Sequence, residues 1–240
     1  MKAFLLAAGH GTRLRPHTDS IPKCLLPIQG VPMLEIWLAL CRQHGISEIL
    51  VNTHAHAAAV GEFLSKWKDG VRVTLVEEPE LFGSAGTLRA NREWVESEDK
   101  FWVFYADVLT CADLGHMLRF HEPSNAATIG VYSVPDPERC GIVELDQNSV
   151  VTSFVEKPGN PRSNLAFAGI MIATQQLLCA IPGKAGADIA FDVLPRLIGK
   201  MRGYPVADYL LDIGTRENYE QAQKTWPGLS AAGVGAIDPK

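Results

Sequence analysis

Two glycines and two cationic side chains lie close together near the start of the chain, directly after a short apolar run. The run, which starts at Lys2 and ends before Gly9, has the composition of a strand buried on both faces of a parallel sheet. Gly9 and Gly11 follow it, and glycines let backbone amides approach a ligand closely. Arg13 and Lys23 add positive charge just beyond them. This combination predicts a site for the phosphates of a nucleoside triphosphate.

Three alternative interpretations of this loop are a simple turn, a dinucleotide-binding loop and the phosphate loop of P-loop NTPases. As an isolated pair, Gly9 and Gly11 would form only a tight turn. The dinucleotide fingerprint G-x-G-x-x-G is incomplete, because Leu14 stands where its third glycine belongs. The phosphate loop G-x-x-x-x-G-K-[ST] occurs nowhere in the chain. The nearby cations therefore favour a triphosphate site of a different kind.

The sequence around the loop resembles the sugar-1-phosphate nucleotidylyltransferases (nucleotidyl-sugar pyrophosphorylases), in their short form without a β-helix extension. Two runs carry the resemblance, L-A-A-G-x-G-T-R-L-R-P at residues 6–16 and I-P-K-x-L-L-P-I at residues 21–28. It extends over residues 2–222 and implies an enzyme that transfers a nucleoside monophosphate from an NTP to a sugar-1-phosphate, releasing pyrophosphate. The nucleotide-binding residues implied here are Ala8, Gly9, Gly11, Thr12, Arg13 and Lys23. Arg13 and Lys23 are also expected to act in catalysis.

Two aspartates follow predicted strands that are far apart in the sequence. Asp107 comes after the apolar run 101–105, and Asp212 opens D-I-G-T, which is close to the D-x-G-T-x-x-x-[YF] signature of the same family. Alone, each would be a turn residue or a helix cap. The resemblance implies that both bind Mg²⁺, the one cofactor expected, and that Asp107 is catalytic. Two carboxylates suffice when the ion keeps water and phosphate oxygens as its other ligands.

Two further segments complete the implied site. The loop G-S-A-G-T-L resembles the one that meets the nucleobase and ribose, and it adds the nucleotide-binding residues Gly83, Ser84 and Gly86. The segments G-I-V and E-K-P add the sugar-phosphate-binding residues Gly141, Glu156 and Lys157. Lys157 is expected to be catalytic as well, because the resemblance places it on the phosphate of the sugar-1-phosphate.

The chain departs from the family pattern on the acceptor side. Cys140 stands where an aromatic residue is frequent, and Phe167 replaces the amide of a common N-A-G. A pocket that hydrogen-bonds a hydroxyl discriminates more strongly than an apolar one. We therefore expect the choice of sugar to depend on this region. The alternative is that Phe167 is an ordinary core residue of a strand.

Strands and helices are expected to alternate through the first half of the chain. The expected strands are the apolar run before Gly9 and residues 46–53, 71–76, 101–105, 126–133, 165–173 and 204–212, with a hairpin at 141–155. The expected helices follow 31, span 57–68, end at 94, follow 113, lie near 175, span 190–200 and follow 215. This order predicts an α/β fold: a doubly wound, mostly parallel, Rossmann-like sheet with helices on both faces and an inserted β-hairpin that forms the sugar-binding region. Ligands bind at the carboxyl ends of such strands, where Gly9 and Asp107 both lie.

Composition sets further limits. With 240 residues and 47% hydrophobic content, we expect one nucleotidyltransferase domain over residues 1–227 and a loose C-terminal tail over 228–240. The net charge of −5 gives no basic field for nucleic acid or an anionic membrane, so neither is expected as a partner. Five cysteines in no metal or disulfide pattern favour a reducing compartment, and we expect a cytoplasmic protein. The oligomeric state stays open.

The substrates expected from the resemblance are an NTP and a sugar-1-phosphate. We favour guanylyl transfer onto mannose- or heptose-1-phosphate, because short members of the family include such enzymes. Uridylyl or thymidylyl transfer to another hexose-1-phosphate is the first alternative, and cytidylyl transfer to a non-sugar phosphate is the second. A nucleotide-sugar sensor without activity would tend to lose Arg13, Lys23 or an aspartate, and all of them are present.

Overall fold

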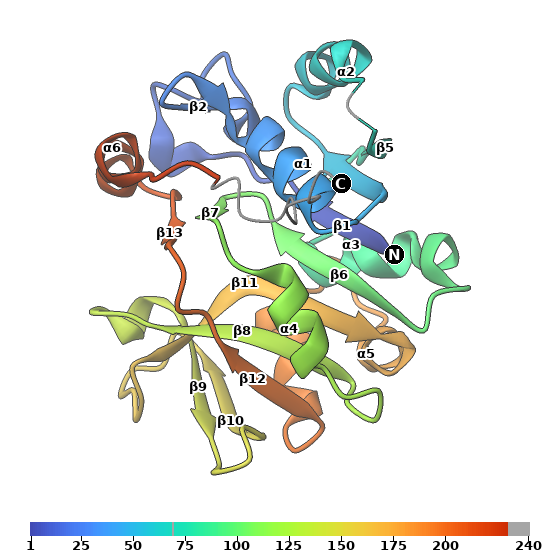
Figure 1. Cartoon of the computed structure of the whole chain (residues 1–240), viewed down its shortest axis with the longest axis vertical. Helices are drawn as coiled ribbons and strands as arrows, with labels where there is room; N and C mark the ends of the chain where they lie inside the picture. The colour runs from blue at the N-terminus through green and yellow to red at the C-terminus, as the bar shows by residue number, and fades with distance from the viewer. Residues whose placement is uncertain (69, 230–240) are drawn as a thin grey trace, which may run out of the picture.

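A nine-stranded sheet runs through the molecule in the computed structural model, which describes residues 1–68 and 70–229 (Figure 1). Its strand order is β10-β9-β11-β6-β1-β4-β5, with β8 paired to β11 and β12 paired to β8. The strands are β1 (Lys2–Leu6), β4 (Glu48–Thr53), β5 (Arg72–Glu77), β6 (Lys100–Tyr105), β8 (Ala127–Ser133), β9 (Gly141–Leu145), β10 (Val151–Glu156), β11 (Leu165–Thr174) and β12 (Met201–Pro205).

Two small ribbons and six α-helices accompany this sheet in the part of the chain that the structure describes. The ribbons pair β2 (Pro27–Ile28) with β3 (Val31–Pro32), and β7 (Val108–Thr110) with β13 (Leu210–Asp212). The helices are α1 (Met33–Gln43), α2 (Ala57–Lys66), α3 (Ser84–Ala90), α4 (Leu114–Phe120), α5 (Gln175–Ala180) and α6 (Arg216–Thr225). No helix in the described part of the chain is long and apolar enough to cross a membrane.

Both faces of the sheet are covered because successive side chains of its central strands point to opposite sides. In β1, Phe4 packs into one hydrophobic cluster while Ala3 and Leu5 pack into the other. One cluster includes apolar side chains of α1, α4 and α6, and the other includes side chains of α3 and α5. Consecutive apolar residues, such as Ala3, Phe4 and Leu5 of β1, are therefore buried on both sides of the sheet.

Parallel pairing brings three strand ends to one edge of the sheet. β1 lies between β4 and β6 and is parallel to both. Leu6, near the end of β1, is in register with Asn52 of β4 and Tyr105 of β6. The loops that follow these strands, including the glycine loop and Asp107, therefore start side by side.

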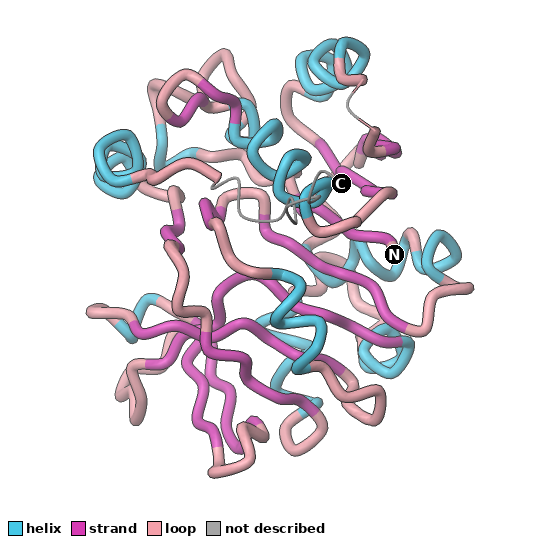
Figure 2. Tube along the Cα trace, viewed as in Figure 1, coloured by secondary structure: helices cyan, strands magenta, loops and turns pink. Residues whose placement is uncertain are grey.

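Strand β11 lies between the parallel strands β6, β1, β4 and β5 on one side and the hairpin β9–β10 on the other (Figure 2). Its first part pairs antiparallel with β9, at Ala166, and its second part pairs antiparallel with β6, from Ile170 onward. Gly169 lies between them with φ +69°, and a methyl group there would come within 2.7 Å of Val108. Glycine thus permits both the backbone conformation and the close approach. The predicted doubly wound, mostly parallel α/β sheet is confirmed, with antiparallel pairings concentrated around β11 and the inserted hairpin β9–β10.

Two predicted elements were wrong. Instead of a helix at 190–200, the chain forms a single π-helical turn, Ile189–Val193, and a 3-10 turn, Leu194–Leu197. Pro195 has no N–H to continue a regular helix. The strand predicted at 204–212 is two strands, β12 and β13, in different sheets. Pro205 ends β12 because it cannot donate to a neighbouring strand.

Two of the expected helices begin at a side-chain cap. Asp113 caps α4 by accepting a hydrogen bond from the His116 N–H at 2.8 Å. Thr215 caps α6 in the same way through the Asn218 N–H at 3.2 Å. The extent of the predicted domain stays a prediction, and residues 230–240 of the predicted C-terminal tail lie outside the described residues.

Candidate active site

A cleft of about 470 Å³ opens at the carboxyl ends of β1, β4 and β6. Most of the predicted nucleotide-binding residues line it: Ala8, Gly9, Gly11, Thr12, Arg13, Lys23, Gly83 and Ser84. Asp107 lines it as well. Gly86 does not, because it is buried and its N–H donates to the Ala187 carbonyl at 3.1 Å. A volume of this size suits a small-molecule ligand.

The glycine loop is held in shape by hydrogen bonds to its backbone. Gly11 adopts φ +63°, and the Thr18 hydroxyl donates to its carbonyl at 2.8 Å. A methyl group at Gly11 would lie 2.9 Å from the Thr18 methyl, so the turn needs glycine both for its conformation and for space. At the start of the loop, the Ala7 N–H donates to Asn52 Oδ1 at 2.8 Å.

Four of the predicted charged residues lie together at one end of the cleft: Arg13, Lys23, Asp107 and Asp212. Lys23 Nζ donates to Asp107 Oδ2 at 2.6 Å. The ribbon of β7 and β13 brings Asp212 to the same place, with the Ile213 N–H donating to the Asp107 carbonyl at 2.9 Å. A methyl group on Gly214 would lie 2.7 Å from an Asp212 carboxylate oxygen, 3.0 Å from Arg13 Nη2 and 3.4 Å from Lys23 Nζ.

Charge at this centre is balanced unevenly between the two aspartates. Burial by itself raises the pKa of Asp107, but the ammonium of Lys23 outweighs this and holds that pKa below its usual value. Desolvation by the surrounding protein and the nearby charge of Asp107 raise the pKa of Asp212. Two like charges so close favour a cation between them.

Oxygen donors at this centre suit a hard cation such as Mg²⁺. Asp107 and Asp212 lie close enough for the charge of Asp107 to raise the pKa of Asp212. No group of three or more His, Cys, Asp or Glu side chains arranged for a metal occurs among residues 1–68 and 70–229. The pair therefore fits an ion that takes its remaining ligands from phosphate oxygens and water.

A buried polar network that the sequence analysis missed links the two nucleotide loops. Asn52, which accepts from the Ala7 N–H, donates through Nδ2 to Glu78 Oε1 at 2.8 Å. The Thr87 hydroxyl donates to the same oxygen at 2.5 Å, and the Phe82 N–H donates to Glu78 Oε2 at 3.1 Å. Glu78 is only 2% exposed and also lines the cleft. The one feature of the sequence that could have indicated this network is Asn52, a polar residue that follows the apolar run of β4.

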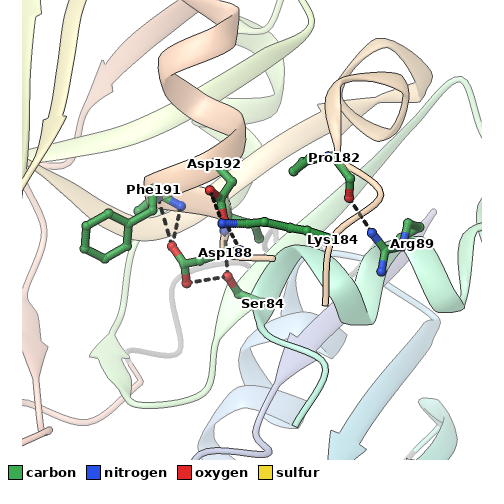
Figure 3. A network of polar contacts seen from close by, with 9 residues as sticks. Ser84, Arg89, Pro182, Lys184, Asp188, Phe191 and Asp192 are labelled. Carbon is green, nitrogen blue, oxygen red and sulfur yellow. Dashed lines mark hydrogen bonds and ion pairs between the residues drawn. The ribbon is translucent and has the colours of Figure 1, made fainter. Parts of the chain in front are cut away.

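Gly83 fixes the second loop against a distant segment. Its φ is +79°, and a methyl group there would lie 2.4 Å from the Ala187 carbonyl oxygen. The next residue, Ser84, donates through its hydroxyl to Asp188 Oδ2 at 2.8 Å (Figure 3). The loop predicted to meet the base is thus attached to residues 187–188, which precede the π-helical turn.

The predicted sugar-phosphate residues lie together beside the cleft rather than in its lining. The hairpin β9–β10 pairs Gly141 with Glu156, and a methyl group on Gly141 would come within 2.6 Å of Glu156 Oε2. Lys157 follows with φ +50°, an uncommon conformation for a non-glycine residue, and its N–H donates to the Cys140 carbonyl at 2.9 Å. Burial raises the pKa of Glu156, and the charge of Asp188 adds to the rise while Lys157 opposes it.

Aromatic rings connect the cleft to this acceptor side. Tyr105 lines the cleft, and its ring meets Phe167 edge-on at 5.7 Å between centroids. Phe167 in turn lies 6.4 Å from Phe154 of the hairpin. Phe167 is half-buried, so it combines a core contact with a place between the two regions. Cys140 is also half-buried, and it lies near enough to Asp212 for that charge to help raise its pKa, after burial.

Known proteins resemble the chain over most of its length. A profile of the nucleotidyl transferase family matches residues 2–227. Among curated proteins, a mannose-1-phosphate guanylyltransferase of Mycobacterium tuberculosis is 33% identical over 223 residues, which are 90% of this chain and 62% of that protein. A UTP–glucose-1-phosphate uridylyltransferase of Synechocystis is 34% identical and covers 92% of this chain and 62% of its own. The chain thus spans less than two thirds of the length of these relatives.

Solved structures share the fold over nearly their whole length. A structure titled UDP-glucose pyrophosphorylase from Acinetobacter baumannii superposes with a TM-score of 0.80 at 25% identity, covering 92% of this chain and 91% of that one. A putative glucose-1-phosphate thymidylyltransferase from Bacillus anthracis gives a TM-score of 0.82 at 26% identity, covering 93% and 94%. The chain belongs to the nucleotidyl transferase family.

Proposed function

We propose that the protein transfers a nucleoside monophosphate from an NTP to a sugar-1-phosphate and releases pyrophosphate. The observation that carries this proposal is the cluster of Arg13, Lys23, Asp107 and Asp212 at the end of the cleft, next to the glycine loop. It offers cations for a triphosphate and carboxylates for its counter-ion. The names of the relatives, which include guanylyl-, uridylyl- and thymidylyltransferases, support the same reaction class.

In the proposed reaction a phosphate oxygen of the sugar-1-phosphate attacks the α-phosphorus of the NTP. The bond to the β-phosphate breaks on the opposite side, and its electrons leave with pyrophosphate. Arg13 and Lys23 neutralise the leaving charge, and Lys157 binds the attacking phosphate, which the triphosphate would otherwise repel. When bound by Asp107 and Asp212, Mg²⁺ would supply further charge neutralisation on the triphosphate. The protein contributes position and electrostatics.

We further propose that guanine is the base. Glu78 lines the cleft beside Gly83 and Ser84, and an ionised carboxylate only accepts hydrogen bonds. The three hydrogen bonds that it accepts from Asn52, Thr87 and Phe82 leave one of its roughly four acceptor positions free. Guanine presents N1–H and N2–H₂ donors on one edge, whereas uracil and thymine flank a single donor with two carbonyls. Several relatives are named mannose-1-phosphate guanylyltransferases, and mannose-1-phosphate is the acceptor we favour, with heptose-1-phosphate second.

A screen of four NTPs against a panel of sugar-1-phosphates, with pyrophosphate release as the signal, tests the reaction directly. Release with GTP and mannose-1-phosphate is the expected result. Release with UTP or TTP and another hexose-1-phosphate would keep the reaction and replace the substrates. Binding of nucleotide sugars without any release would favour a sensor. The cytoplasmic location stays a proposal, and five free cysteines are in keeping with it.

Replacing Arg13 or Lys157 by alanine is expected to damage different halves of the reaction. Arg13 lies on the cleft beside the glycine loop, whereas Lys157 lies on the hairpin side. Arg13→Ala should raise the KM of the NTP about tenfold, and Lys157→Ala should do the same to the sugar-1-phosphate, since each loses one charge-assisted contact. Arg15→Ala is the matched control, because Arg15 is exposed and pairs with Asp19. Equal damage to both KM values by both variants would contradict the assignment.

Replacing Glu78 by glutamine is expected to change the ranking of NTPs. A glutamine amide offers a donor to a pyrimidine carbonyl and loses an acceptor for guanine. We expect kcat/KM with GTP to fall about tenfold while the value with UTP stays level or rises. Glu77→Gln, at an exposed neighbouring position, is the control. An equal fall with all four NTPs would mean that Glu78 only supports the loops.

A further inference from the structure

Phe191 is an aromatic residue that the core does not use. At 56% exposure it is the most exposed of the large apolar side chains in the described part of the chain. An aromatic ring left in water forgoes the gain from burial. Whether a bound ligand can cover the Phe191 ring depends on where this ring lies relative to the site.

The turn that carries Phe191 is held firmly to the nucleotide side of the site (Figure 3). Asp188 accepts hydrogen bonds from the N–H groups of Ala190 at 2.8 Å and Phe191 at 3.0 Å. The other oxygen of Asp188 accepts from the Ser84 hydroxyl, which itself accepts from the Ile189 N–H at 2.8 Å. The backbone of Phe191 is therefore fixed to the loop that lines the cleft.

A second anchor holds the far side of the turn. Asp192 accepts from the Asp188 N–H at 2.8 Å and forms an ion pair with Lys184 at 2.7 Å. In Figure 3 the Phe191 ring points away from this network while its backbone stays within it. The ring is thus presented outward by a fixed backbone.

The ring meets the predicted sugar-phosphate residues. The ammonium of Lys157 lies 5.8 Å from the ring centroid of Phe191, and 3.9 Å from Glu156 Oε1. At that distance the cation and the ring attract each other. A phosphate bound by Lys157 would therefore sit close to the ring, which places the ring within reach of the sugar attached to that phosphate.

We propose that Phe191 forms an apolar wall for the sugar ring of the acceptor and so helps to select the sugar. The inference rests on the proposed function. A pyranose ring carries hydroxyls around its edge and presents C–H groups on its face. Glu156 offers acceptors to the hydroxyls, Lys157 binds the phosphate, and Phe191 covers a C–H face. An axial hydroxyl pointing at the ring loses its hydrogen bonds, so epimers are distinguished at this wall.

The test compares Phe191→Ala with the wild type on a panel of hexose-1-phosphate epimers at saturating NTP. We expect the KM of the preferred epimer to rise roughly tenfold, the preference among epimers to shrink, and the KM of the NTP to stay unchanged. Phe191→Trp should restore most of the preference, because it replaces one aromatic face with another. Ile198→Ala removes a 41% exposed apolar side chain just after the same segment and should change none of these values.

Two results would overturn the wall. The first is an unchanged KM for every epimer in Phe191→Ala. The second is an equal rise for all epimers, which would mean that the ring only positions Lys157. If the wild type turned over no pair of substrates, the proposed function would fail. Titrating hexose-1-phosphates into Phe191→Trp would still test whether the side chain at position 191 contacts the sugar ring. Epimer-dependent changes in the fluorescence emission of the added indole, relative to the wild type, would support this contact. No change in emission with any epimer would rule the contact out.

Discussion

Asp107→Asn is expected to lower kcat by about a hundredfold or more, equivalent to about 3 kcal/mol of barrier, while the protein stays folded. An amide is a poor ligand for Mg²⁺, and it leaves the ammonium of Lys23 without the carboxylate it now contacts at 2.6 Å. The side chain of Asp107 is 31% exposed, so an asparagine of the same shape can be solvated. Steady-state pyrophosphate release at saturating Mg²⁺, with a thermal melt on the same sample, measures both quantities.

Asp212→Asn provides the companion measurement. If both aspartates act on one ion, either single variant removes most of the effect, and the double variant should lose far less than the product of the two losses. Independent, multiplicative losses would mean that the two carboxylates act separately. Turnover like that of the wild type in a folded Asp107→Asn protein would remove the metal assignment altogether.

Gly214→Ala is expected to lower kcat/KM by roughly tenfold to a hundredfold with little loss of stability. The added methyl group would come within 2.7 Å of Asp212 Oδ1 and 3.0 Å of Arg13 Nη2. These are the ends of side chains rather than backbone atoms, so the structure yields by moving them. The displacement therefore falls on the groups that carry charge in the proposed reaction, and activity is lost before stability.

Gly183→Ala is the matched control for this substitution. No atom lies within 4 Å of a methyl group at Gly183, and neither glycine has a positive φ. Both variants change the unfolded chain in the same way, and only one of them reaches the charged centre. Similar activity in the two variants would show that Arg13 and Asp212 tolerate displacement, and would weaken the case for a fixed charged centre.

The sequence was most informative where a short run decides both local structure and position. An apolar strand followed by glycines, as at Lys2–Leu6, predicts a parallel strand and a ligand loop at its carboxyl end, and the structure has both. Asp107 and Asp212 could be paired only through the family resemblance. The β7–β13 ribbon brings these two residues together across a separation of 105 residues. Each strand of the ribbon has only three residues, and neither has a distinctive sequence pattern.

Long-range polar contacts were beyond the reach of sequence patterns. Asn52 lies on β4, Glu78 in the loop after β5 and Thr87 on α3, and nothing in their spacing indicates that they share hydrogen bonds. Gly86 looked like part of a ligand loop, yet the structure packs it against the backbone of Ala187. Its role in nucleotide binding, like that of the other predicted site residues, stays a prediction.

The ribbon of β7 and β13 also determines when the protein acquires its full set of charged groups during synthesis. Translation delivers the glycine loop, Lys23 and Asp107 well before Asp212, and domains generally fold as units. A nascent chain at that stage has the cations and one carboxylate, but it has neither the second carboxylate nor Gly214. Because domains fold as units, such a chain is not expected to form the finished site. The charged centre is therefore complete only late in translation, when the Leu210–Asp212 strand pairs with β7.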